Sequence, residues 1–131
     1  MSLNILVVDD CDLFTHSLGT VLAMKLKATI YTANTVQDAL AILDKPPVEF
    51  DAIVSDWRFD TADPDAVTGR LRHGASFLHR VWAAHHIPVI VVTGVHTDVL
   101  EADAKSLGAL AVFAKPVPLD ELFSILLGLQ D

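Results

Sequence analysis

Acidic, hydroxyl and basic side chains stand where several apolar runs of this 131-residue sequence end. Asp9 and Asp10 follow the first run, and Asp56 ends a later one. Thr93 and Lys115 end two further runs. A carboxylate at the end of a buried run costs free energy unless a cation or a hydrogen-bond donor pairs with it. Each of these carboxylates therefore needs a partner.

Three carboxylates that lie close together cannot all ionise cheaply unless a cation joins them. A hard divalent cation fits such a set, and Mg²⁺ keeps waters while it joins carboxylates to a phosphate. With the metal in place, one carboxylate can act as a nucleophile toward phosphorus. Lys115 would then balance the phosphoryl charge, and the Thr93 hydroxyl would donate to another phosphoryl oxygen. These residue types predict phosphoryl chemistry at a carboxylate.

The elements that must position these residues alternate between short apolar runs and helical periodicity. The predicted strands cover residues 3–8, 29–32, 50–55, 88–93 and 110–114. The predicted helices begin near residues 14, 35, 77, 97 and 118. Strands and helices that alternate in this way predict an α/β protein with a doubly wound, five-stranded parallel sheet.

Capping residues mark several of these helix ends. Thr35 and Asp38 form a capping-box-like start for the second helix. Thr97 or Asp98 can cap the fourth helix, and Gly108 stands at its end. Pro118 suits the first position of the final helix, whose apolar stripe of Leu119, Leu122, Phe123 and Leu126 we expect in the core.

Ligands of open parallel sheets bind beyond the carboxyl ends of the strands. The predicted strands end in Asp9-Asp10, Asp56, Thr93 and Lys115, so we expect one shared site at that edge. An acidic turn stands where a dinucleotide-binding protein has a glycine-rich loop. Because that turn repels a pyrophosphate, dinucleotide binding is disfavoured.

Charge and hydropathy exclude several classes of protein. The chain has 17 acidic residues against 9 Lys and Arg, a formal net charge of −8, so we expect no direct nucleic-acid binding. No apolar stretch reaches the roughly 18 residues of a membrane span. The amino terminus lacks a secretory signal, so we expect a cytoplasmic protein. The single cysteine, Cys11, excludes an internal disulfide.

Four segments match, in order, the strand ends of a known family. They are ILVVDD (5–10), DAIVSD (51–56), PVIVVTG (88–94) and FAKP (113–116). With these segments the whole chain resembles the response-regulator receiver domain of two-component signalling, in the CheY-like superfamily. The resemblance implies a single domain over residues 1–131, with a flavodoxin-like (βα)5 fold and strand order 2-1-3-4-5.

The resemblance implies a phosphoacceptor and a metal site. Asp56 would accept a phosphoryl group from the phosphohistidine of a sensor histidine kinase or phosphotransfer protein. Asp10 would bind Mg²⁺ directly, and Asp9 would bind it partly through water. Asp56 and the backbone carbonyl of Arg58 would complete the protein ligands. Such a switch performs phosphotransfer and autodephosphorylation on itself, and we do not expect an enzyme that turns over a metabolite.

The resemblance also assigns the residues around the phosphoryl group. Thr93 and Lys115 would hold its oxygens, and the bond before Pro116 would be cis. The family commonly has an aromatic switch residue at the position of Val112. Phe113 is offset by one and is expected to point to the opposite face of its strand. Either the conformational switch uses residues other than this aromatic, or the phosphoryl group is recognised locally, through the long loop that follows Asp56.

The segment at about 57–74 departs from the family. Receivers usually have Met-Pro and then a glycine shortly after the phosphoacceptor, whereas Met-Pro is absent here and Gly74 comes much later. A solvated loop and a lid or partner-docking loop are both open interpretations. In the family, the side chains two residues after the phosphoacceptor and two residues after the threonine flank the path of an attacking water. Arg58 and Val95 stand at these positions here. Because Val95 cannot orient water, we predict slow autodephosphorylation.

Two other functions make different demands on the sequence. A phosphorylation-independent interaction module would keep the fold, and Val112 leaves that alternative open. An aspartate-nucleophile phosphatase usually needs a second acid two residues after the nucleophile. Arg58 stands at that position, so this enzyme class is disfavoured.

His85 and His86 are adjacent on a predicted helix and cannot pair as metal ligands. By analogy with the family, the last two helices and the fifth strand could pair two copies.

Overall fold

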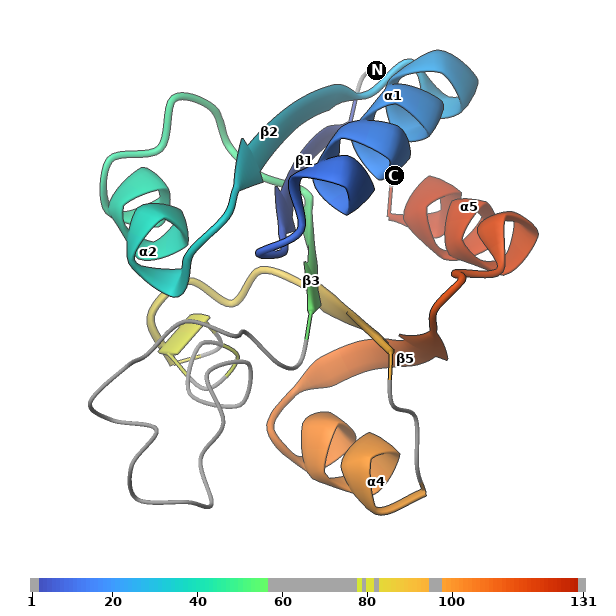
Figure 1. Cartoon of the computed structure of the whole chain (residues 1–131). Helices are drawn as coiled ribbons and strands as arrows, with labels where there is room; N and C mark the ends of the chain where they lie inside the picture. The colour runs from blue at the N-terminus through green and yellow to red at the C-terminus, as the bar shows by residue number, and fades with distance from the viewer. Residues whose placement is uncertain (1–2, 57–77, 79, 82, 95–97, 130–131) are drawn as a thin grey trace.

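The structure is a computed structural model, and it describes residues 3–56, 78, 80–81, 83–94 and 98–129. A parallel five-stranded sheet has the order β2-β1-β3-β4-β5 (Figure 1). Its strands are β1 (Asn4–Val8), β2 (Thr29–Ala33), β3 (Ala52–Asp56), β4 (Val89–Thr93) and β5 (Ala109–Ala114). The predicted doubly wound, flavodoxin-like sheet is confirmed.

Helices cover both faces of the sheet. Their bounds are α1 (Asp12–Leu26), α2 (Val36–Asp44), α4 (Asp98–Ser106) and α5 (Leu119–Gly128). Residues 78, 80, 81, 83 and 84 are also helical, where the third helix is predicted. Helices α1 and α5 pack on one face, and α2 and α4 pack on the other (Figure 1). With both faces covered, the strand ends remain as the place for a ligand.

Each face of the sheet has its own apolar cluster, because neighbouring residues of a strand point to opposite faces. In β1, Leu6 and Val8 pack on the side of α2 and α4. Ile5 and Val7 pack on the side of α1 and α5. Strands β3 and β4 are buried along their whole length, which explains why each is a continuous apolar run. The polar residues that end these strands are therefore anchored in a packed core.

Helix α2 begins and ends as its sequence signals predict. The Thr35 hydroxyl accepts a hydrogen bond of 3.0 Å from the backbone N–H of Asp38. The helix ends at Asp44, before Pro46. Gly108 has φ 109° after α4, a conformation that favours glycine.

Two predictions at α5 are wrong. Pro118 is the N-cap residue with ψ 100°, so the helix begins one position later than predicted, at Leu119. The side chain of Leu119 is 38% exposed, whereas Leu122 and Leu126 are buried in the core. Leu119 is the first residue of the helix, and it lines the pocket between α1 and the start of α5 rather than the buried core. The predicted loop at 57–74 lies outside the described residues.

Candidate functional site

The carboxyl ends of four strands bring the candidate residues to one edge of the sheet. Asp9 follows β1 directly, and Asp56 and Thr93 are the last residues of β3 and β4. Lys115 follows β5, and its backbone N–H donates to the Thr93 carbonyl at 2.8 Å. Because neighbouring parallel strands end together, residues far apart in sequence become neighbours.

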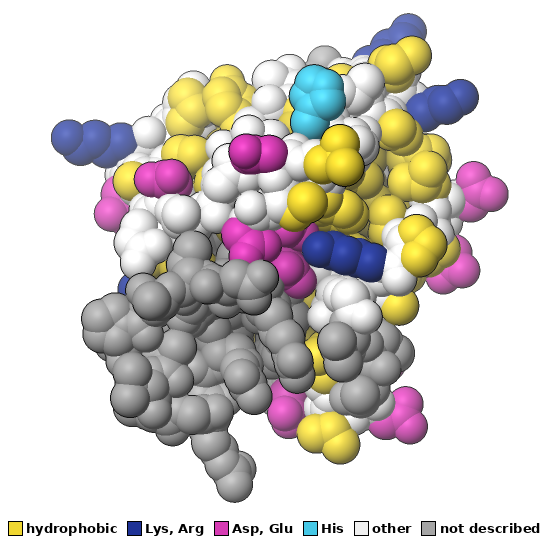
Figure 2. Space-filling view, in the orientation of Figure 1, with side chains coloured by type: hydrophobic (Ala, Val, Ile, Leu, Met, Phe, Trp, Pro, Cys, Tyr) yellow, Lys and Arg dark blue, Asp and Glu magenta, His cyan; other side chains and the backbone are white. Residues whose placement is uncertain are grey.

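Three carboxylates form the acidic part of this site. Oxygen atoms of Asp9, Asp10 and Asp56 lie within 4.8 Å of one another. Asp9 is fully buried at 0% exposure, and Asp56 is 8% exposed. Figure 2 shows acidic side chains gathered beside a basic one on this face of the molecule. Burial at this spacing requires positive charge nearby.

Lys115 supplies positive charge to this cluster. Its ammonium donates to Asp9 Oδ2 at 2.6 Å and lies 3.7 Å from Asp56 Oδ2. Burial alone would lower the pKa of Lys115. The hydrogen bond to Asp9 and the charges of Asp56 and Asp9 outweigh burial, and they raise the pKa above its ordinary 10.5. Lys115 therefore carries its charge at neutral pH.

Backbone and side-chain donors hold Asp9 in place. The N–H of Cys11 donates to Asp9 Oδ1 at 2.9 Å, so each carboxylate oxygen of Asp9 has a donor. The Asn34 amide donates to the Asp9 carbonyl at 2.9 Å, and the Asp9 N–H donates to the Ala33 carbonyl. Asn34 was not among the predicted site residues. Its position just after the second predicted strand was the available signal.

The contact between Phe14 and Lys115 was not predicted either. The Lys115 ammonium lies 4.3 Å from the centre of the Phe14 ring. From the sequence, residue 14 was predicted only to lie near the start of the first helix. The ring and the lysine both line an apolar pocket of about 260 Å³ between α1 and the start of α5.

The structure describes most of the remaining predicted site residues, but not Arg58 and Val95. The Lys115-Pro116 peptide bond is cis. Thr93 is buried at the end of β4. Val112 packs in the cluster under α2 and α4, and Phe113 packs on the opposite face, as strand alternation predicts. The predicted metal ligand Arg58 and the neighbouring candidate Val95 lie outside the described residues.

The donor set of the acidic cluster fits a hard divalent cation. Carboxylate oxygens are the ligands that Mg²⁺ and Ca²⁺ prefer, and Asp9, Asp10 and Asp56 each offer one at mutually compatible distances. No other group of three His, Cys, Asp or Glu residues in the described part of the chain meets this criterion. The arrangement can bind a cation and present the Asp56 carboxylate to a phosphorus atom.

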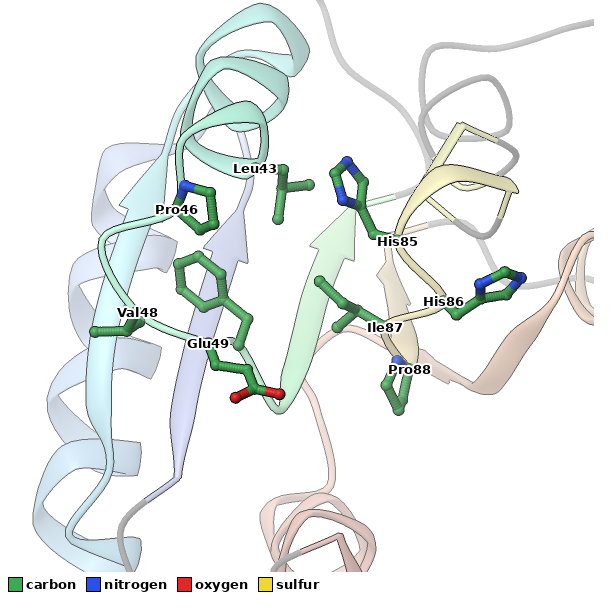
Figure 3. A pocket seen from close by; sticks show the side chains of 9 residues that line it. Leu43, Pro46, Val48, Glu49, His85, His86, Ile87 and Pro88 are labelled. Carbon is green, nitrogen blue, oxygen red and sulfur yellow. The ribbon is translucent and has the colours of Figure 1, made fainter.

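A second pocket, of about 280 Å³, lies near the amino ends of β3 and β4, away from the acidic cluster. His85, His86 and Glu49 line it together with apolar residues such as Phe50 and Ile87. Figure 3 shows the two imidazole rings pointing in different directions. His86 has φ 56°, and its N–H donates to the Val81 carbonyl. The two histidines therefore end a helix here, and their rings do not converge on a common ligand position.

Comparison with known families identifies a match along nearly the whole chain. The sequence model of the response regulator receiver domain matches residues 5–127. A comparison with curated protein sequences finds no match.

In the described part of the chain, no helix has both the length and the apolar character that crossing a membrane requires.

Several solved structures have the same fold. The receiver domain of Francisella response regulator 1452 is 21% identical, with a TM-score of 0.80 over 98% of this chain and 96% of that one. The beryllofluoride-activated NtrC4 receiver domain dimer is 24% identical, with a TM-score of 0.76 over 96% and 94%. A Burkholderia pseudomallei response regulator with a phosphorylated aspartic acid, calcium ion and citrate is 21% identical, with a TM-score of 0.79 over 95% and 66%. At these identities the likeness shows the shared fold.

Proposed function

The chain belongs to the response regulator receiver domain family, and we propose that it is a switch that accepts a phosphoryl group on Asp56. One observation carries this proposal. The Asp56 carboxylate ends a buried strand beside two further carboxylates and the Lys115 ammonium. A structural carboxylate needs one cation as a partner, whereas this grouping suits a nucleophile that receives a highly charged phosphoryl group.

The proposed donor is the phosphohistidine of a sensor histidine kinase or phosphotransfer protein. An Asp56 carboxylate oxygen attacks the phosphorus atom, a new O–P bond forms, and the P–N bond of the donor breaks. The electron pair of that bond remains on the imidazole nitrogen of the donor. The products are an acyl phosphate on Asp56 and an unmodified histidine. A cytoplasmic location is part of the proposal, because such kinases present their phosphohistidine there.

Lys115 and Thr93 hold the transferred group in this mechanism. The Lys115 ammonium lies 3.7 Å from Asp56 Oδ2, within reach of an oxygen on a phosphoryl group attached there. It would exchange part of its contact with Asp9 for a charge-assisted hydrogen bond to that oxygen. Thr93 ends the neighbouring strand, and its hydroxyl would donate to a second phosphoryl oxygen. Both contacts strengthen as charge moves onto the phosphoryl oxygens.

We propose that Asp9, Asp10 and Asp56 hold Mg²⁺, with Asp9 binding partly through water and the Arg58 carbonyl as a further ligand. The mutual distance of the carboxylate oxygens supports this assignment. When bound, Mg²⁺ supplies positive charge that offsets the charges of the carboxylates and the incoming phosphoryl group. Lys115 would add its own positive charge, since its ammonium lies 3.7 Å from Asp56 Oδ2.

A phosphorylation-independent interaction module is the second candidate, and one observation favours it. Val112 stands where the family commonly has an aromatic switch residue, and its side chain packs in the core cluster beneath α4. If no group replaces that aromatic, modification of Asp56 would leave the partner surface unchanged. Partner binding that is equal with and without phosphorylation would support this candidate.

A homodimer through the face formed by α4, β5 and α5 is also part of the proposal. A groove of about 410 Å³ on this face is lined by Leu110, Ile125 and polar residues of α4 and α5. Leu110 is 48% exposed, more than a core residue of a strand would be. The NtrC4 receiver, which shares the fold, forms a dimer.

Intact mass spectrometry tests the proposed modification. After incubation with acetyl phosphate and Mg²⁺, we expect one labile phosphoryl adduct on the wild-type chain and none on Asp56→Asn. Asp51→Asn is the matched control, because it removes the same charge at the opposite end of β3, where Asp51 accepts from the Asn4 N–H. An adduct of equal yield on Asp56→Asn would refute Asp56 as the acceptor.

A further inference from the structure

The ring of Phe14 faces the cation of the candidate site. Phe14 lies in the first turn of α1, and the Lys115 ammonium lies 4.3 Å from the centre of its ring. Aromatic faces attract cations at centroid distances within about 6 Å, because the ring quadrupole places negative charge there. The contact is therefore electrostatic as well as a packing contact.

The Lys115 side chain is long and flexible. Four rotatable bonds separate the ammonium from the backbone, and the side chain is 25% exposed, so burial alone does not fix the position of the ammonium. Lys115 lines the apolar pocket between α1 and the start of α5, together with Leu18 and Val117. Phe14 contributes both to this pocket and to the position of the ammonium. Phe14 is thus next to both the pocket that Lys115 lines and the Lys115 ammonium.

We propose that Phe14 is a positioning residue for phosphoryl transfer, and that its ring face keeps the Lys115 ammonium between Asp9 and Asp56. The inference rests on the proposed function and deepens it by assigning a residue outside the acidic cluster. Phe14 acts through Lys115, which lies 2.6 Å from Asp9 Oδ2 and 3.7 Å from Asp56 Oδ2. The rate of transfer depends on the fraction of molecules in which the ammonium is already in place.

The competing account is that Phe14 only fills space. Its side chain packs against the cluster under α1 and α5, as does Phe123 of α5. A change to alanine would not separate the two accounts, because it removes packing and ring charge together. Fluorination of the ring does separate them, since it reduces the negative charge of the ring face and changes the shape little.

The test uses fluorinated phenylalanines incorporated site-specifically at position 14 in the full chain. Mono-, di- and pentafluorinated rings should lower the phosphorylation rate with acetyl phosphate and Mg²⁺ stepwise, by about two- to fivefold in total. The same series at Phe123 is the control, and we expect an unchanged rate there. Phe14→Tyr keeps the ring face and should keep the rate. Phe14→Leu keeps apolar volume and should behave like the pentafluorinated ring.

A second readout does not require phosphorylation. The ε-methylene protons of Lys115 should resonate upfield in the wild-type chain, because they lie near an aromatic ring face. The signal is assigned by its loss in Lys115→Arg. In Phe14→Leu it should move to the position of the exposed lysines. In the pentafluorinated chain it should move part of the way, as the ammonium leaves the ring.

The outcomes separate this inference from the proposed function. A wild-type chain that is phosphorylated at a rate insensitive to fluorination at position 14 overturns the inference and leaves the proposed function standing. A Lys115 signal without an upfield shift also overturns the inference. A wild-type chain that accepts no phosphoryl group overturns both. Stepwise loss of rate at position 14, with an unchanged rate at Phe123, supports the inference.

Discussion

At the level of single residues, Lys115 supplies positive charge to the acidic cluster through its contacts with Asp9 and Asp56. Asp9 is fully buried and has Lys115 and the Cys11 N–H as its donors. A buried carboxylate that loses a charged partner keeps its desolvation cost without the compensating attraction. The stability of the unmodified protein and the chemistry of the site therefore depend on the same side chain.

Replacing Lys115 tests this dependence. We expect Lys115→Met to lower the free energy of unfolding by on the order of 1–3 kcal/mol, because it leaves Asp9 buried beside two further carboxylates. Added Mg²⁺ should restore part of this loss, since a cation in the cluster takes over the neutralising charge. Urea unfolding with and without Mg²⁺ measures both effects.

Lys105→Met is the matched control for this experiment. Lys105 pairs with Glu101 at 3.1 Å one turn away on α4, and both side chains are substantially exposed. Such surface pairs contribute about 0.3–0.5 kcal/mol. Equal losses of stability for Lys115→Met and Lys105→Met would contradict the special role of Lys115.

At the level of elements, the turns that follow the strands position the site. The turn from β2 to α2 carries Asn34, whose amide donates to the Asp9 carbonyl, and Thr35, which caps α2. Cys11, between β1 and α1, donates its N–H to Asp9 Oδ1. The acidic edge is therefore held in place by donors from two connections, the one between β1 and α1 and the one between β2 and α2.

The cap of α2 gives a prediction at this scale. Thr35→Ala should lower the free energy of unfolding by about 1 kcal/mol, because the Asp38 N–H loses the Thr35 hydroxyl as its acceptor. Thr35→Ser keeps an acceptor and should retain most of the stability. Thermal unfolding followed by circular dichroism measures the difference. An alanine variant as stable as the serine variant would mean that the cap contributes little to this helix.

At the level of the whole molecule, the fold and the main site residues are predictable for one physical reason. Strands buried on both faces are continuous apolar runs, so each strand and its end can be located in the sequence. Parallel strands place these ends at one edge of the sheet, which brings Asp9, Asp56 and Thr93 together. The prediction that Lys115 lies at the same edge follows from the same rule.

Contacts between side chains of different elements were not predictable. Helical spacing places Phe14 on an apolar face but does not say that its ring faces Lys115, because that depends on how α1 packs beside the end of β5. The hydrogen bond from Asn34 to Asp9 likewise depends on the turn after β2. The start of α5 differed by one residue, since a proline can occupy either the cap or the first turn.

The central claim is that the phosphoryl group resides on Asp56, and chemical trapping tests it most directly. Borohydride reduces the acyl phosphate of an aspartate to homoserine, which survives digestion and is located by peptide mass spectrometry. After treatment with acetyl phosphate and Mg²⁺, the account predicts homoserine at position 56 and aspartate at positions 9 and 10. Homoserine at another acidic residue, or a phosphoryl group that borohydride does not convert, would contradict it.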